Sequence, residues 1–148
     1  MSRARQVASE ATLDLGFHSG WWEGMNNQEV IMRNARTETG LIAHSKALEA
    51  AGIAISLVMR VPAPLKSIAD QVIRSASAVP ANLSEGHGRS GRDRLHHWRI
   101  AYGSAKEVDT HLRLLAHARA IDQRRAESAL NLFDDVRALT WRLLHPKP

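Results

Sequence analysis

Apolar residues recur at intervals of three and four along four separate segments of this 148-residue chain. An α-helix has 3.6 residues per turn, so this spacing places the apolar side chains of each segment on one helical face. No segment shows the sustained alternation of apolar and polar residues that predicts a β-strand. The chain is therefore predicted to be all-α, an antiparallel up-and-down four-helix bundle with short connections.

Each predicted helix has its own apolar stripe and its own boundary signals. The first is expected from Thr37 and ends at the VPAP stretch of residues 61–64, because a residue before proline is pushed out of the helical region. The predicted buried stripe of this first helix is Leu41, Ser45, Leu48, Gly52, Ile55 and Met59. The stripe of the second helix is Leu65, Ile68, Val72, Ala76, Val79 and Leu83.

The second half of the chain repeats this arrangement. A third helix is expected over residues 92–119, and Asp122 is predicted to be the N-cap of the fourth. The stripe of the third helix is Leu95, Trp98, Tyr102, Ala105, Val108, Leu112 and Leu115. That of the fourth is Ala126, Leu130, Phe133, Val136, Thr140 and Leu143. Residues 37–146 are thus assigned to the bundle, and residues 1–36, which show no sustained period, to a flexible N-terminal extension.

Composition excludes several classes of protein. The chain has no cysteine, so it can form neither a disulfide framework nor a thiolate metal site. No apolar run approaches the roughly 20 residues that cross a bilayer, and no secretory signal is recognisable at the N-terminus. A single Asp93-x-x-His96 pair is too little for a di-iron site in a bundle. We expect a cytoplasmic protein without membrane contact, metal or cofactor.

Positive charge is concentrated on the third predicted helix. The net charge is +5, and residues 92–121 contain six basic and three acidic residues. Arg92, Arg99, Lys106 and Arg113 follow one another at intervals of seven, so they form one stripe, which Arg89 and Arg94 extend. Such a row can bind a phosphate backbone in a salt-dependent way. The alternative is a solvent-exposed face whose charge is partly neutralised by ion pairs, since Asp109 lies four residues before Arg113.

The segments IADQVIRSASAVPANLSEGHGR (68–89) and IAYGSAKEVDTHLRLLAHA (100–118) carry a family resemblance. They resemble the bacterial proteins encoded in intervening sequences of 23S ribosomal RNA, a family that includes the accessory variability determinant of diversity-generating retroelements. The resemblance implies a four-helix bundle, a homopentameric ring, nucleic-acid binding and a reverse transcriptase as candidate partner. The matching residues, which we expect to be structural, are Arg74, Pro80, Asn82, Glu85, Gly86, Gly103, Ser104 and Glu107.

These observations favour a non-catalytic, basic accessory or scaffold protein that binds RNA or DNA. Its predicted nucleic-acid-binding residues are Arg89, Arg92, Arg94, Arg99, Lys106 and Arg113. Two alternatives stay open. Arg92 and His97 resemble the Arg-polar-x-x-x-His motif of the HEPN ribonucleases, in which His titrates near neutral pH. The third class is a scaffold that binds only protein, whose binding would be insensitive to salt.

Overall fold

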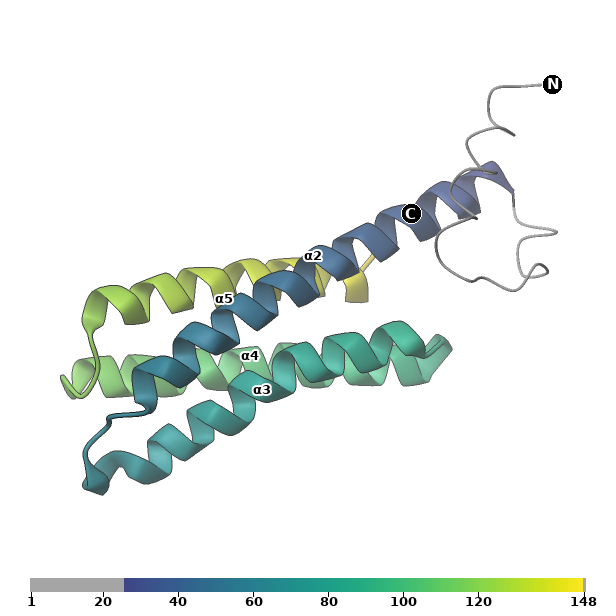
Figure 1. Cartoon of the computed structure of the whole chain (residues 1–148). Helices are drawn as coiled ribbons and strands as arrows, with labels where there is room; N and C mark the ends of the chain where they lie inside the picture. The colour runs from purple at the N-terminus through teal and green to yellow at the C-terminus, as the bar shows by residue number, and fades with distance from the viewer. Residues whose placement is uncertain (1–25, 148) are drawn as a thin grey trace. The chain divides into compact units, whose positions relative to one another are not determined.

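The computed structural model describes residues 26–147, which form four α-helices and one short 3-10 helix and include no β-strand (Figure 1). Over residues 34–147 successive helices run antiparallel and are joined by short turns, as the periodicity predicted. The predicted four-helix bundle is confirmed. The elements are α2 (Asn27–Val58), η1 (Ala63–Leu65), α3 (Lys66–Gly88), α4 (Gly91–His117) and α5 (Gln123–Leu144).

Helix α2 begins ten residues before Thr37, where the apolar pattern placed the first helix. A reciprocal cap fixes this start: the side chain of Asn26 accepts from the backbone N–H of Glu29 at 2.9 Å, and that of Glu29 accepts from the N–H of Asn26 at 3.0 Å. The chain divides into a unit that ends at Arg33 and the bundle unit from Asn34 onward. Residues 1–25 of the predicted extension lie outside the described residues.

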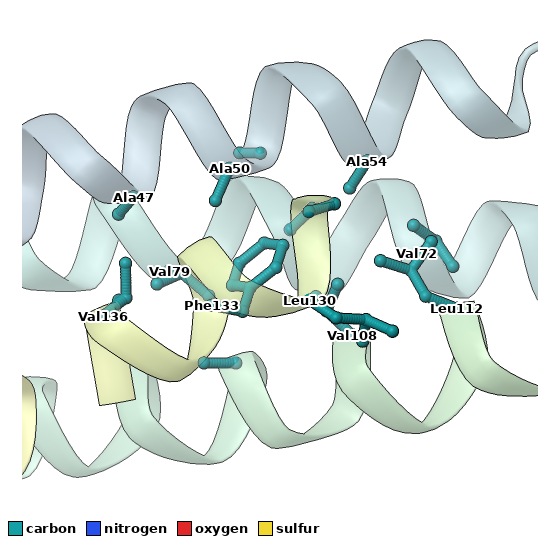
Figure 2. Packing of buried hydrophobic residues seen from close by; sticks show 14 of the residues in the cluster. Ala47, Ala50, Ala54, Val72, Val79, Val108, Leu112, Leu130, Phe133 and Val136 are labelled. Carbon is teal, nitrogen blue, oxygen red and sulfur yellow. The ribbon is translucent and has the colours of Figure 1, made fainter. Parts of the chain in front are cut away.

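The core of the bundle is formed by large apolar side chains from α3, α4 and α5 (Figure 2). All six residues predicted for the stripe of the last helix are buried in α5, and the Asp122 carboxylate accepts from the N–H of Arg125 at 2.7 Å as the predicted N-cap. On α3 and α4 the predicted stripes are buried except at Leu65, Ile68, Leu95 and Tyr102, which are half-buried. The largest fully buried side chains are Trp98, Phe133, Leu83, Leu112, Leu115 and Leu143.

Helix α2 buries a different face from the one that the sequence predicted. Its core residues are small: alanines line the side that packs on the bundle (Figure 2). Leu41, Leu48 and Met59 of the predicted stripe are instead exposed to 63%, 54% and 68%. Alanine lets a helix approach its neighbours closely, so packing distance overrode the preference for burying larger side chains. The buried residues of α2 are Ala43, Ala47, Ala50, Ala51, Ala54, Leu57 and Val58, together with Gly40.

Helix α2 is also long and apolar enough, by length and composition alone, to cross a membrane. The core helices of soluble proteins meet the same two criteria, so this is weak support for a membrane span. Its alanine face belongs to the bundle core, and Lys46 on the same helix bonds Asp135 of α5 at 2.7 Å. Within residues 34–147, α2 is therefore a packed helix of the bundle.

The end of α3 is held against the start of α4 by a glycine. Gly86 is buried, and a Cβ at this position would collide with the indole of Trp98, a side chain that is 1% exposed. His87 lies next to it with its ring against Gly40 of α2 and edge-on to Trp98, at 5.8 Å between ring centroids. Burial lowers the pKa of His87. Residues of α2, α3 and α4 thus pack together around Gly86 and His87.

We predict that Gly86→Ala destabilises the bundle by about 1–3 kcal/mol, because the fully packed Trp98 cannot move away from an added methyl group. Urea unfolding followed by circular dichroism would measure the loss. Gly88→Ala is the matched control: it lies two residues on, with open space around its Cβ, and should leave stability unchanged or slightly raised. Equal stability of both variants would contradict this account of the contact.

Candidate nucleic-acid interface

The outer face of α4 displays the basic row that the sequence predicted. Arg92, Arg99 and Lys106 are exposed, and none of them makes an ion pair with any residue in the described part of the chain. They lie opposite the buried face of α4 because a spacing of seven residues returns to nearly the same side of the helix. The three charges extend over about 21 Å of the helix axis. These three side chains form an accessible row of positive charge along α4.

Arg113, the fourth member of the row, is partly neutralised. Its guanidinium donates to both oxygens of Asp109, at 2.8 and 3.2 Å, as the spacing of four residues predicted. Asp109 also pairs with Arg137 of α5 at 3.3 Å, and Arg137 bonds Asp134. Burial alone would raise the pKa of Asp109, but the hydrogen bond from Arg113 and the charge of Arg137 outweigh it and lower that pKa. Arg113 is therefore paired within α4, and Asp109 is the residue that joins α4 to α5.

The two arginines at the turn between α3 and α4 are engaged within the chain. Arg89 pairs with Glu85 at 2.5 Å and with Asp93 at 3.3 Å, and its hydrogen bond lowers the pKa of the Glu85 carboxyl. The Nε of Arg94 donates to the carbonyls of Arg89 and Gly86, at 2.7 and 3.2 Å. Its guanidinium also lies 5.7 Å from the ring centroid of Trp98. Both side chains hold the turn, so they offer less charge to a ligand than Arg92 does.

The residues of the HEPN-like motif are not brought together within the chain. Arg92 is exposed, whereas His97 lies about 140° around the helix and is half-buried against α3. There His97 Nδ1 lies 3.1 Å from Asn82 Oδ1, and its Nε2 lies 4.0 Å from Asp93. The amide of Asn82 also donates to the carbonyl of Ala78 at 2.9 Å. Asn82 and His97 thus connect two helices.

The other residues that carry the resemblance have varied surroundings. Pro80 is buried inside α3, which stays helical to Gly88. Arg74 is exposed, Ser104 is half-buried, and Glu107 lies 3.7 Å from His111. Gly103 was expected to be structural, but it lies on the exposed face of α4, and nothing in the described residues lies within 4 Å of a Cβ built there.

Two aromatic side chains beside the basic row were missed as site residues. Tyr102 of α4 and Trp141 of α5 have ring centroids 5.9 Å apart, and Trp141 is 52% exposed. Tyr102 was assigned to the core and is only half-buried. The sequence did contain a signal for Trp141. It directly follows the buried Thr140 and so lies off the apolar stripe of α5, where a large aromatic side chain is exposed.

Acidic and imidazole groups do not gather into a metal site: among residues 26–147, no group of three or more such side chains could hold an ion. A shallow pocket of about 320 Å³ lies where α4 ends and α5 begins, with a lining that includes Arg113, His117, Arg119 and Glu127. The fold and this surface together define a small helical bundle with one basic outer helix.

Comparison with known proteins identifies the family of this bundle. Residues 40–142 match the 23S rRNA-intervening sequence proteins, and the chain belongs to that family, as its motifs indicated. The bundle is similar to the crystal structure of a protein of unknown function from the S23 ribosomal protein family of Bacteroides thetaiotaomicron. That similarity has 24% sequence identity and a TM-score of 0.65, covers 72% of this chain and 97% of the other, and establishes the fold alone. No curated protein matches the chain.

The ion-pair network of Asp109 leads to a pH-dependent prediction. Asp109→Asn should lower the free energy of unfolding by about 1–2 kcal/mol at neutral pH, because it removes the charged acceptor of Arg113 and Arg137. The pKa of Asp109 is lowered in the folded state, so this stabilisation is present above its ordinary value of 3.8 and is lost as pH falls further.

Urea unfolding at about pH 7 and about pH 3.5 would measure the difference between wild type and variant, which should shrink at the lower pH. The control is Asp134→Asn, which removes a more exposed partner of Arg137 and should cost under about 0.5 kcal/mol. An Asp109→Asn variant no less stable than this control at neutral pH would contradict the role given to the network.

Proposed function

We propose that this protein is a non-catalytic accessory protein that binds nucleic acid through the outer face of α4. The observation that carries the proposal is the row of Arg92, Arg99 and Lys106, which are exposed and make no ion pair with any described residue. Charges held by carboxylates have little to gain from a phosphate, whereas free ones release counterions when they bind it. The row follows a straight helix, which suits a repeating polyanion better than a small ligand.

We further propose that copies of the chain assemble into a homo-oligomeric ring. Leu41, Leu48 and Met59 form an exposed apolar stripe on α2, on a different side from the alanine face that packs in the bundle. Exposed apolar side chains that no described residue covers are typical of a protein–protein interface. A second copy is the partner that fits, since the family resemblance implies a pentamer. In a ring, the basic face of α4 would be repeated once per subunit.

The resemblance supplies the remaining proposals. A reverse transcriptase and its template RNA are the candidate partners if the chain serves a diversity-generating retroelement, and the expected location is the cytoplasm. The presence of a reverse-transcriptase gene beside the gene for this protein would support the first of these. The choice between RNA and DNA depends on the binding experiment below.

We predict that replacing Arg92, Arg99 and Lys106 together by alanine weakens binding to RNA or DNA and reduces its salt dependence. Loss of three phosphate contacts should lower the slope of log K against log salt by about 2 to 3. Fluorescence anisotropy with a labelled oligonucleotide, across about 50 to 200 mM salt, would measure both effects. The RNA should be intact on a gel after the assay.

A charge-matched variant provides the control. Arg60, Arg124 and Lys147 are exposed residues outside α4, and their replacement by alanine removes the same net charge. This control should keep most of the salt slope. Equal loss in both variants would mean that net charge alone attracts the ligand, and absence of wild-type binding at low salt would leave a purely protein-binding scaffold. RNA cleavage that disappears in His97→Ala would overturn the non-catalytic assignment.

The proposed assembly has its own prediction. Leu41→Glu combined with Leu48→Glu should convert the oligomer to monomer, because two charges would be buried at the interface without partners. Sedimentation velocity would measure the mass in solution. Ala138→Glu places a charge on the exposed side of α5 and should leave the oligomer intact. A wild-type protein that sediments as a monomer at all accessible concentrations would disprove the assembly.

A further inference from the structure

Three aromatic rings form a cluster on the surface where α4 and α5 meet. Trp141 stacks on His145, with ring centroids 3.8 Å apart and an angle of 28° between the planes. Tyr102 lies against the same indole from α4, at 5.9 Å and a tilt of 49°. His145 is further held by its Nδ1, which lies 3.1 Å from the carbonyl of Trp141. The indole is thus supported by two rings and is still 52% exposed.

The charge around this cluster is positive. Arg99 and Lys106 lie three residues before and four residues after Tyr102, so all three side chains share one side of α4. Neither has an ion-pair partner in the described residues. On α5, Arg142 follows Trp141 directly and is exposed.

Carboxylates near the cluster are few and already engaged. Helix α4 has none between Asp93 and Glu107, and α5 has none after Asp135. Asp135 itself pairs with Lys46 of α2 at 2.7 Å, and Asp134 pairs with Arg137. An anionic ligand at the indole would therefore meet no acidic side chain from residues 94–106 of α4 or 136–144 of α5.

We propose that Trp141 and Tyr102 form a stacking site for unpaired bases of a single-stranded nucleic acid, with Arg99 and Lys106 binding the flanking phosphates. The proposal rests on the function proposed above and specifies its ligand. Single-strand binding sites combine a basic track with exposed aromatic rings on which bases stack. A duplex keeps its bases paired inside, so it can use the basic row but not the indole. The protein should therefore prefer single strands.

The full-length protein with a single-stranded oligonucleotide and a duplex of the same phosphate number provides the test. Trp141→Ala should weaken single-strand binding by about 5- to 150-fold, the loss expected from about 1–3 kcal/mol per stacked base, and should change duplex binding less than about twofold. Trp141→Phe keeps a ring and should retain most of the affinity. The control is Leu114→Ala, which changes an exposed apolar residue on α4 and should alter neither single-strand nor duplex binding.

Tryptophan fluorescence gives a second readout that does not depend on affinity. Saturating single strand should quench the wild type, and the quenching should be largely absent in Trp141→Phe even though that variant still binds. Binding by the wild type with no effect of Trp141→Ala on single strands would overturn the stacking site while leaving the basic row intact. A change in sedimentation without a change in single-strand affinity would assign the cluster to a protein contact instead. Absence of any salt-dependent wild-type binding would reject the proposed function itself.

Discussion

The contact between Gly86 and the indole of Trp98 determines how the rest of the bundle is arranged. It brings the end of α3 within van der Waals contact of α4, and it works only because position 86 has no side chain. Arg94 then closes the turn through two backbone carbonyls, and Asn82, one turn before Gly86 on α3, meets His97 of α4. With this register fixed, α4 must turn Trp98 inward and the opposite side, with Arg99, outward. The basic face is therefore a consequence of core packing.

Arginine serves two purposes on α4, and the partners of each side chain decide which. Arg94 donates to two carbonyls and joins α4 to the end of α3, and Arg113 pairs with Asp109 within α4. Arg92 and Arg99 are exposed and make no ion pair with a described residue, so their charge is available. A sequence count treats these four as equal, although only the second pair adds to a surface that attracts phosphate. The aromatic cluster at Trp141 lies beside the charges that are free, which is why the two features form one proposed site.

Helix α2 shows why an apolar pattern can indicate the wrong face. Its larger side chains, such as Leu41 and Leu48, follow a helical period that is as regular as that of any core stripe. Yet the bundle takes the alanine side, where Ala47 and Ala54 are fully buried. Small side chains allow a closer approach between helices than leucine does. The periodicity of the large residues thus describes an apolar surface of the subunit, and the proposed assembly would cover it. When a helix has two apolar faces, its sequence alone does not decide which face is buried in the bundle.

The sequence by itself determined the number of helices, their antiparallel order, the stripes of α3, α4 and α5, the N-cap at Asp122 and the family. These depend on local periodicity and on residues close in sequence, such as the pair of Asp109 and Arg113. Only the tertiary structure decided which face of α2 is buried, that Asp109 of α4 pairs with Arg137 of α5, and that Tyr102 and Trp141 meet at the surface. Each of these depends on distances between helices far apart in the chain. Such distances follow from the fit of side chains across the core, such as the collision that excludes a Cβ at Gly86, which no single segment encodes.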